Sequence, residues 1–200
     1  MPRTRKRHLQ QSFVFREPGI DGRGGKRKGA GRPPKGPRSS EPHKRRPPHD
    51  PRHPVHVTLR VVPGLGSLRK RDKYLAIREA TIAVIPHDGF RIVHFSVQSN
   101  HIHLVAEATG KAALSRGLKA FQISAAKHIN AAVRKRSGVR RRGQVFADRY
   151  NARALSSPRA VRHAICYVLN NWRRHEEDRA QHARRWKVDP FSSGAHFGWK

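Results

Sequence analysis

The spacing of apolar residues predicts an α+β fold built on one antiparallel sheet. Residues 56–62 alternate and are rich in β-branched side chains, which is typical of a strand. Two further runs of this kind, 90–97 and 101–107, are separated by only three residues and predict a hairpin. Helical segments and one more extended segment complete the order β-α-β-β-α-β-α. This order is typical of a ferredoxin-like sandwich, in which an antiparallel sheet carries its helices on one face.

The first strand and the first helix have recognisable ends. A Pro-Gly pair at positions 63–64 closes the strand. Residues 72–85 have helical content, with Asp72 as the expected N-cap and Pro86 just past the last turn. The apolar side of this helix is expected to consist of Tyr74, Ile77, Ile82 and Ile85.

The second half of the chain predicts two more helices around an extended segment. Residues 112–135 form a long helix with an apolar stripe made of Leu114, Leu118, Phe121, Ala125, Ile129 and Ala132. Residues 144–155 are predicted to be extended. Ser156-Ser157-Pro158 then begins a last helix that runs to about residue 177, because Ser favours the N-cap and Pro the first turn.

Residues 1–52 are predicted to form a disordered basic arm, and residues 53–200 one folded domain. The arm consists mainly of Gly, Pro, Arg, Lys, Ser and His and has too few large apolar residues for a core. Within it, residues 24–35 resemble an AT-hook, whose Gly-Arg-Pro element would lay Arg32 into a narrow minor groove. Ala30 stands where the usual element has a second Arg, and a solvated basic tail is the alternative interpretation.

The charge of the chain predicts a polyanionic partner. Its 200 residues include 44 Lys and Arg against 13 Asp and Glu, a net charge of +31, so nucleic acid is expected first and an anionic membrane surface second. No apolar run approaches the roughly 18 residues of a spanning helix, so a cytoplasmic, nucleoid-associated protein is expected and a membrane protein is excluded. A single cysteine, Cys166, excludes a disulfide framework and a cysteine-based metal cluster. Charge alone fits equally a packaging protein that only neutralises phosphate.

His101-Ile102-His103 is the first candidate for chemistry. In a strand, residues i and i+2 point to the same side, so the two imidazoles project together while Ile102 faces the core. Two adjacent imidazoles can hold a divalent metal. A solvated or structural histidine pair is the alternative, since the chain has 14 histidines.

The last predicted helix supplies the second candidate. Its inward stripe is expected to consist of Val161, Ile165, Val168 and Trp172. Beside this stripe, a phenol, an amide and two cationic or titratable groups share one helical line, formed by His163, Tyr167, Asn171 and Arg174. Such a line is either catalytic or a set of packing and rim residues.

Several segments, taken in order, resemble a known family. Residues 100–105, Asn-His-Ile-His-Leu-Val, resemble the Asn-His-(Val/Ile)-His-Leu signature of HUH single-strand endonucleases, and residues 167–172, Tyr-Val-Leu-Asn-Asn-Trp, resemble a Tyr-Ile-His-Leu-Asn-Pro block. Residues 143–150 and 189–193 are similar to two further family stretches. The chain is thereby similar to the single-tyrosine insertion-sequence transposases and their REP-associated relatives over about residues 55–199. Trp172 replaces the usual Pro.

The resemblance implies a metal-dependent tyrosine transposase that cuts and rejoins single-stranded or hairpin DNA. Tyr167 would be the nucleophile, and His101, His103 and Asn171 would bind Mg²⁺ or Mn²⁺. The expected product is a 5′-phosphotyrosine with a free 3′-OH. Whether two chains form a homodimer is left open.

Other polar residues are candidates for phosphate contact, each with solvated surface as the alternative. Besides Arg32, they are Lys119, Lys127, Arg140, Arg141, Arg142, Arg149, His163 and Arg174. Two other function classes compete with the transposase. One is a nucleic-acid-binding protein without catalysis, such as a domesticated relative or an RNA binder. The other is a hydrolase that activates water at the two histidines and leaves Tyr167 structural.

Overall fold

The computed structural model describes residues 46–177 and 183–196. They belong to a compact unit formed by residues 40–200. Most of the predicted basic arm, including Arg32, lies outside the described residues. Of the arm, only residues 46–52 are described, and His49 contacts the folded body there through Nε2, 3.1 Å from the Ala108 carbonyl oxygen. No helix in the described ranges is long and apolar enough to cross a membrane.

Four antiparallel strands form the sheet of the described domain. They are β1 (Val55–Arg60), β2 (Phe90–Val97), β3 (His101–Ala108) and β4 (Asn151–Ala154), in the order β2-β3-β1-β4. The hairpin of β2 and β3 follows the predicted bounds to within one residue. The long segment predicted to be extended before the last helix contributes only the four residues of β4 to the sheet. The order and the antiparallel pairings confirm the predicted ferredoxin-like α+β class.

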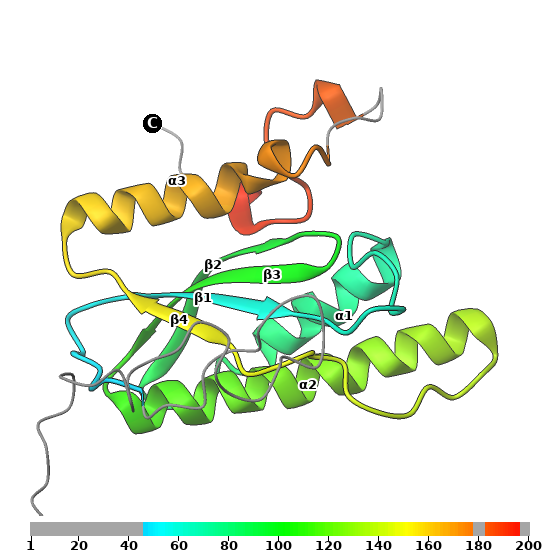
Figure 1. Cartoon of the computed structure of the whole chain (residues 1–200), viewed down its shortest axis with the longest axis horizontal. Coiled ribbons are helices and arrows are strands. Elements are labelled where there is room, and N and C mark those ends of the chain that lie inside the picture. The colour runs from blue at the N-terminus through cyan, green and yellow to red at the C-terminus, as the bar shows by residue number, and fades with distance from the viewer. Residues whose placement is uncertain (1–45, 178–182, 197–200) are drawn as a thin grey trace, which may run out of the picture. The chain divides into compact units, whose positions relative to one another are not determined.

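Two helices cover one face of this sheet, as expected. They are α1 (Arg71–Ile82) and α2 (Lys111–Ser137), which lie together beneath the strands in Figure 1. The core between sheet and helices is built from alternate strand residues, such as Leu59, Ile102 and Leu104, against Leu118 and Phe121 of α2, all fully buried. Alternation in the strands therefore leaves the residues between them for the opposite face.

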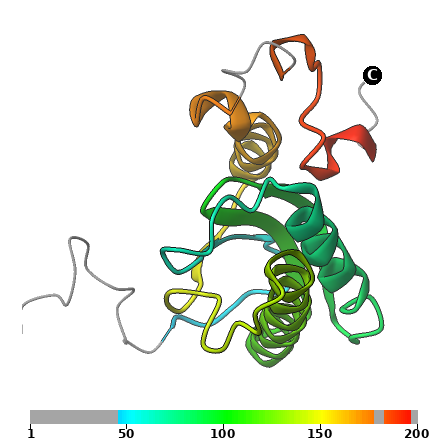
Figure 2. The same ribbon diagram turned by 90° about the vertical axis from the view of Figure 1, so that its right-hand side faces the viewer.

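The third helix, α3 (Pro158–Arg174), lies on that opposite face (Figures 1 and 2). The prediction that the helices cover one face of the sheet is therefore correct for α1 and α2 but not for α3. The reason is a second, smaller apolar cluster, in which Val105 of β3 meets Leu155, Ala164 and Val168. Ser157 begins α3 as predicted, because its side chain accepts a hydrogen bond from the Ala160 amide.

The first helix differs from its prediction in its ends and in its buried side. Lys70, not Asp72, occupies the N-cap position, and the helix ends at Ile82. Ile82 and Ile85 are exposed, by 48% and 73%. Ile77 is buried as predicted, and the rest of the buried side consists of Lys73, Ala76 and Ala80. The two alanines stand where larger residues were expected because α1 packs closely against α2.

The segment after α3 returns to the sheet and fastens the end of that helix. The Val97 amide donates to the Phe191 carbonyl, and Ser192 forms an isolated bridge with Ser96. Arg69 donates two hydrogen bonds of 2.9 Å to the carboxylate of Asp189, which is fully buried. Trp172 stands where the family that the sequence resembles has Pro. It is buried, and its ring centroid lies 6.1 Å from that of Trp186. The substitution thus supplies a packing contact for the returning segment.

Candidate active site

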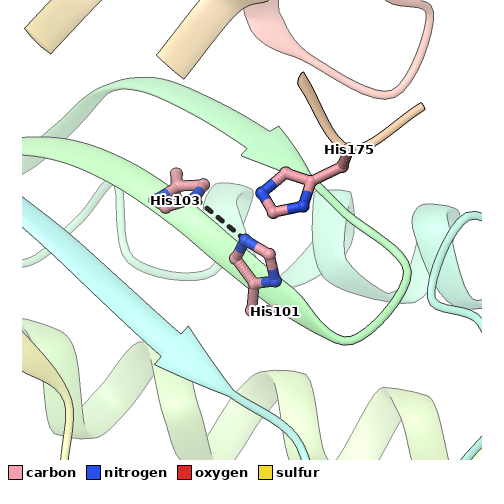
Figure 3. Close-up of side chains that lie close together, drawn as sticks. All are labelled: His101, His103 and His175. Carbon is pink, nitrogen blue, oxygen red and sulfur yellow. Dashed lines mark hydrogen bonds between the residues drawn. The ribbon is translucent and has the colours of Figure 1, made fainter. Parts of the chain in front are cut away.

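The two histidines of β3 lie side by side on the sheet face that α3 covers. His101 and His103 point to the same side, as their spacing predicts, and Ile102 points into the core. Their Nε2 atoms are 3.0 Å apart (Figure 3). Two nitrogen lone pairs at this distance can share one proton or bind one cation between them.

Neighbouring residues hold the outer nitrogen of each ring. His101 Nδ1 lies 2.6 Å from Asn100 Oδ1, so it donates to the amide oxygen and leaves Nε2 with its lone pair. His103 Nδ1 lies 3.1 Å from His56 Nε2 and 3.3 Å from Thr58 Oγ1. Such contacts to the far ring nitrogen fix the orientation and tautomer of metal-binding histidines.

Both rings are held neutral. Burial, followed by the charge of His175 and then Arg60, lowers the pKa of His101 from 6.5 to about 4. Burial, followed by the neighbouring imidazoles, lowers the pKa of His103 to about 2. At neutral pH each ring is therefore neutral and has one nitrogen lone pair that can bind a metal.

Helix α3 brings three more polar side chains to this face, spaced i, i+4 and i+8. The Tyr167 ring stands edge-on to His103, with centroids 5.3 Å apart, and 5.8 Å from His56. Tyr167 remains 37% exposed and is open to a large substrate. Asn171 is 2% exposed, yet its amide nitrogen and oxygen find no hydrogen-bond partner among the described residues.

His175, at the C-cap of α3, completes a cluster of three imidazoles (Figure 3). Its ring lies 4.8 Å from the His101 ring, and one nitrogen of each of His101, His103 and His175 lies within 4.8 Å of the others. The neutral imidazoles of His101 and His103 and the buried Asn171 amide, unpartnered among the described residues, fit a divalent cation by donor type. The residues present thus fit the metal that the sequence implied, with His175 as an added nitrogen donor.

Two arginines flank the cluster on the same sheet face. Arg60 is the register partner of His101, and Arg153 of β4 is the register partner of His56. Each arginine lowers the pKa of its neighbouring histidine, although burial is the larger cause. Both side chains are exposed and can contact phosphate next to the histidines.

The predicted phosphate contacts are spread over the molecule. Lys119 and Lys127 are exposed on α2, on the face of the sheet away from the histidines. Arg140 and Arg142 are exposed in the loop after α2. Arg141 instead donates hydrogen bonds to the Asn130 side chain and to the carbonyl oxygens of Gly143 and Gln144. Arg149 is exposed beside a cavity of about 810 Å³ that Lys111 and Tyr150 also line. His163 is exposed within the first half of α3, and Arg174 is exposed at its last residue.

Sequence interpretation missed His56, His175, Arg60 and Arg153. The strand pattern contained a signal for two of them, because His56 and Arg60 alternate with the core residues Val57 and Leu59. His175 continues the spacing from Tyr167 to Asn171 by one more turn. Arg153 gave no signal, since its place depends on how β4 pairs with β1.

Comparisons with known proteins identify the family and a similar fold. The sequence model of a family described as "Transposase IS200 like" matches residues 66–171. The solved structure of a REP-associated tyrosine transposase bound to a REP hairpin is similar in fold, with a TM-score of 0.58 and 18% identity, over 78% of this chain and 84% of that one. No curated protein matches the chain in sequence.

Proposed function

Since this chain belongs to the IS200-like transposase family, we propose that it cuts and rejoins single-stranded DNA through a covalent bond to Tyr167. The observation that carries the proposal is the edge contact between the Tyr167 ring and His103, whose Nε2 lies 3.0 Å from that of His101. This contact would set a nucleophile beside a cation site, an arrangement suited to phosphodiester cleavage.

In the proposed step, Tyr167 Oη attacks the scissile phosphorus. A bond forms between Oη and phosphorus, and the bond from phosphorus to the 3′ oxygen breaks. The phenol loses its proton and the departing 3′ oxygen gains one, so that the products are a phosphotyrosine and a 3′-OH. Rejoining reverses the step with the 3′-OH of another strand, and it needs no nucleotide cofactor because the phosphotyrosine is itself a phosphodiester. An ordinary phenol has a pKa near 10 and is a weak nucleophile at neutral pH, so the phosphate must be made more electrophilic.

His101, His103 and Asn171 would hold Mg²⁺ or Mn²⁺ for this purpose. A bound divalent cation supplies Lewis-acid polarisation of a phosphate oxygen. Burial keeps both imidazoles neutral, and their Nδ1 atoms contact Asn100 and His56. Both features favour binding of a cation through Nε2. The buried amide of Asn171, unpartnered among the described residues, is suited to the same role.

The proposed substrate is a single strand next to a hairpin, such as a REP-type palindrome. Arg60 and Arg153 lie opposite His101 and His56 on the sheet face of the cluster and can contact phosphates near the reacting one. The basic arm over residues 1–52, whose first 45 residues are proposed to be disordered when free, adds phosphate contacts that carry no sequence information. Among the other basic residues, Arg142, Arg149 and Arg174 are exposed and suited to contacts with the hairpin.

Covalent capture tests the function. The parent protein, mixed with Mg²⁺ or Mn²⁺ and a labelled single-stranded hairpin, is expected to form a denaturant-resistant adduct that peptide mapping assigns to Tyr167. Tyr167→Phe removes only the nucleophilic oxygen, so it should fold and bind the hairpin like the parent but form no adduct. Tyr74→Phe is the matched control, because Tyr74 packs against Phe95 and Phe191, away from the histidines.

The outcomes separate the competing functions. An adduct that persists in Tyr167→Phe would assign the nucleophile to another residue. Metal-dependent cleavage without any adduct would favour a hydrolase that activates water at His101 and His103. Hairpin binding with no cleavage in either metal would favour a binding protein without catalysis.

A further inference from the structure

His175 is fixed in place although its side chain is exposed. Its backbone amide caps α3 by donating to the Asn171 carbonyl at 3.1 Å. Two residues on, the Glu177 carboxylate accepts a 3.0 Å hydrogen bond from the Ser99 amide, in the turn between β2 and β3. Arg69, itself paired with buried Asp189, lies 3.5 Å from the same carboxylate. The end of α3 is therefore tied to the turn that leads directly into His101.

This attachment places a third imidazole against the β3 pair. The rings of His101 and His175 meet edge-to-face at 4.8 Å and 72°, and the ligand nitrogens of the three rings lie within 4.8 Å of one another. Figure 3 shows His175 turned toward the gap between the other two side chains. No acidic side chain joins them in the described ranges, since the metal-ligand cluster there consists of these histidines alone.

We propose that His175 is a metal ligand and that, with it, the site selects Mn²⁺ and other imidazole-binding cations over Mg²⁺. This inference rests on the proposed function for its use in the reaction. Three imidazoles and one amide oxygen form a nitrogen-rich donor set. Mg²⁺ prefers oxygen ligands and gives up its water reluctantly, whereas first-row transition metals bind imidazole increasingly well from Mn²⁺ to Co²⁺. The exposed side of His175 leaves room there for water or a phosphate oxygen.

The first experiment measures metal binding without DNA. Mn²⁺, Co²⁺ and Mg²⁺ are titrated separately into the full-length protein and into His175→Ala by calorimetry, and the Co²⁺ absorption spectrum reports the nitrogen ligands. The variant is expected to lose about tenfold or more in affinity for Mn²⁺ and Co²⁺, at least as much as loss of a residue that supports a ligand. Its Mg²⁺ affinity should change by less than about twofold, since imidazole contributes little to Mg²⁺ binding.

Two further variants make the result specific. His128→Ala removes an exposed histidine from α2, on the other side of the sheet, and should bind each metal like the parent. His175→Gln replaces the nitrogen donor with an oxygen donor of similar reach, so it should bind Mn²⁺ with a smaller preference over Mg²⁺. Thermal unfolding verifies that all variants fold, which is expected because neither side chain is buried.

Failure of this inference and failure of the proposed function give different results. If the parent forms the Tyr167 adduct but His175→Ala binds Mn²⁺ and Co²⁺ as tightly as the parent, His175 is not a ligand and the transposase function stands. If the parent forms no adduct but His175→Ala loses Mn²⁺ and Co²⁺ affinity, the metal site stands and the function is wrong. A parent that binds Mg²⁺ at least as tightly as Mn²⁺ overturns the proposed selectivity.

Discussion

The imidazoles of β3 are prepared as ligands by their neighbours. Asn100 Oδ1 accepts a hydrogen bond from His101 Nδ1, and His103 Nδ1 contacts His56 and Thr58. The Nε2 atoms of His101 and His103 therefore point toward each other. Because burial keeps both rings neutral, the folded protein maintains lone pairs at a pH where an exposed histidine is already partly protonated. Because the folded protein keeps these rings neutral, its unfolding free energy depends on pH.

We predict that acid destabilises the metal-free protein through these histidines. The unfolded chain takes up protons below a pKa of about 6.5, whereas folded His101 does so only near pH 4. Stability is therefore fully present above pH 6.5 and is lost as the pH falls toward 4. Between pH 7 and 5 we expect a loss of about 1–2 kcal/mol from His101. Urea unfolding at the two pH values, with a chelator present, measures it.

His101→Gln is the comparison, since it removes the titrating ring and retains a polar side chain. Its unfolding free energy should fall less than that of the parent over the same pH interval. An equal fall in both proteins would show that other groups cause the acid sensitivity.

At the scale of elements, α3 and the segment after it decide the geometry of the site. The apolar contacts of α3 with the sheet centre on Val105, Leu155, Ala164 and Val168, a much smaller cluster than the one under α1 and α2. The buried ion pair of Arg69 and Asp189 adds a polar attachment at its C-terminal end. A helix that rests on few apolar contacts depends more on such attachments.

We predict that Asp189→Ala costs about 3–5 kcal/mol of unfolding free energy, because it leaves the Arg69 guanidinium buried without its partner. Arg69 is 6% exposed at its side chain and Asp189 is 0% exposed. Urea unfolding measures the effect. Asp50→Ala is the control, because Asp50 pairs with the exposed Arg52 and its removal should change little. Equal stability of Asp189→Ala and the parent would mean that the ion pair of Arg69 and Asp189 does not hold the segment after α3.

At the scale of the whole molecule, charge governs how the protein meets DNA. The first 45 residues contain 14 Lys or Arg against three Asp or Glu, about a third of the net charge of +31. The described domain retains its own basic residues on both faces, including Arg60 and Arg153 beside the histidines. We therefore expect the arm to add affinity to a body that can bind DNA by itself.

Deletion of residues 1–45 is predicted to leave the domain folded and to weaken DNA binding for all sequences alike. The deletion ends before Arg46, which contacts Tyr150 through its guanidinium. The plot of log K against log salt should become shallower, because fewer counterions are released. Titrations of hairpin and random single strands at several salt concentrations measure the slope. An unchanged slope, or loss of folding, would contradict an arm that binds DNA.

Local patterns determined much of this protein. The hairpin, the N-cap at Ser157 and the shared side of His101 and His103 follow from residues close in sequence, whose geometry is set by the periods of strands and helices. The family resemblance likewise rests on short segments in a fixed order, and the family match confirms it. The isoleucines of α1 show the limit, because which side of a weakly amphipathic helix is buried depends on its partner, here α2.

Only the tertiary structure decided how the elements meet. The sequence did not predict that α3 crosses to the second face. Periodicity alone does not bring Tyr167, Asn171 and His175 to β3, and only the family resemblance related Tyr167 and Asn171 to its two histidines. His56 and Arg153 enter through pairings of β1 with β3 and β4, between residues about 50 to 100 positions apart. The physical reason is that local periodicity fixes the direction of a side chain, whereas its neighbours are fixed by apolar packing and by hydrogen bonds between distant segments.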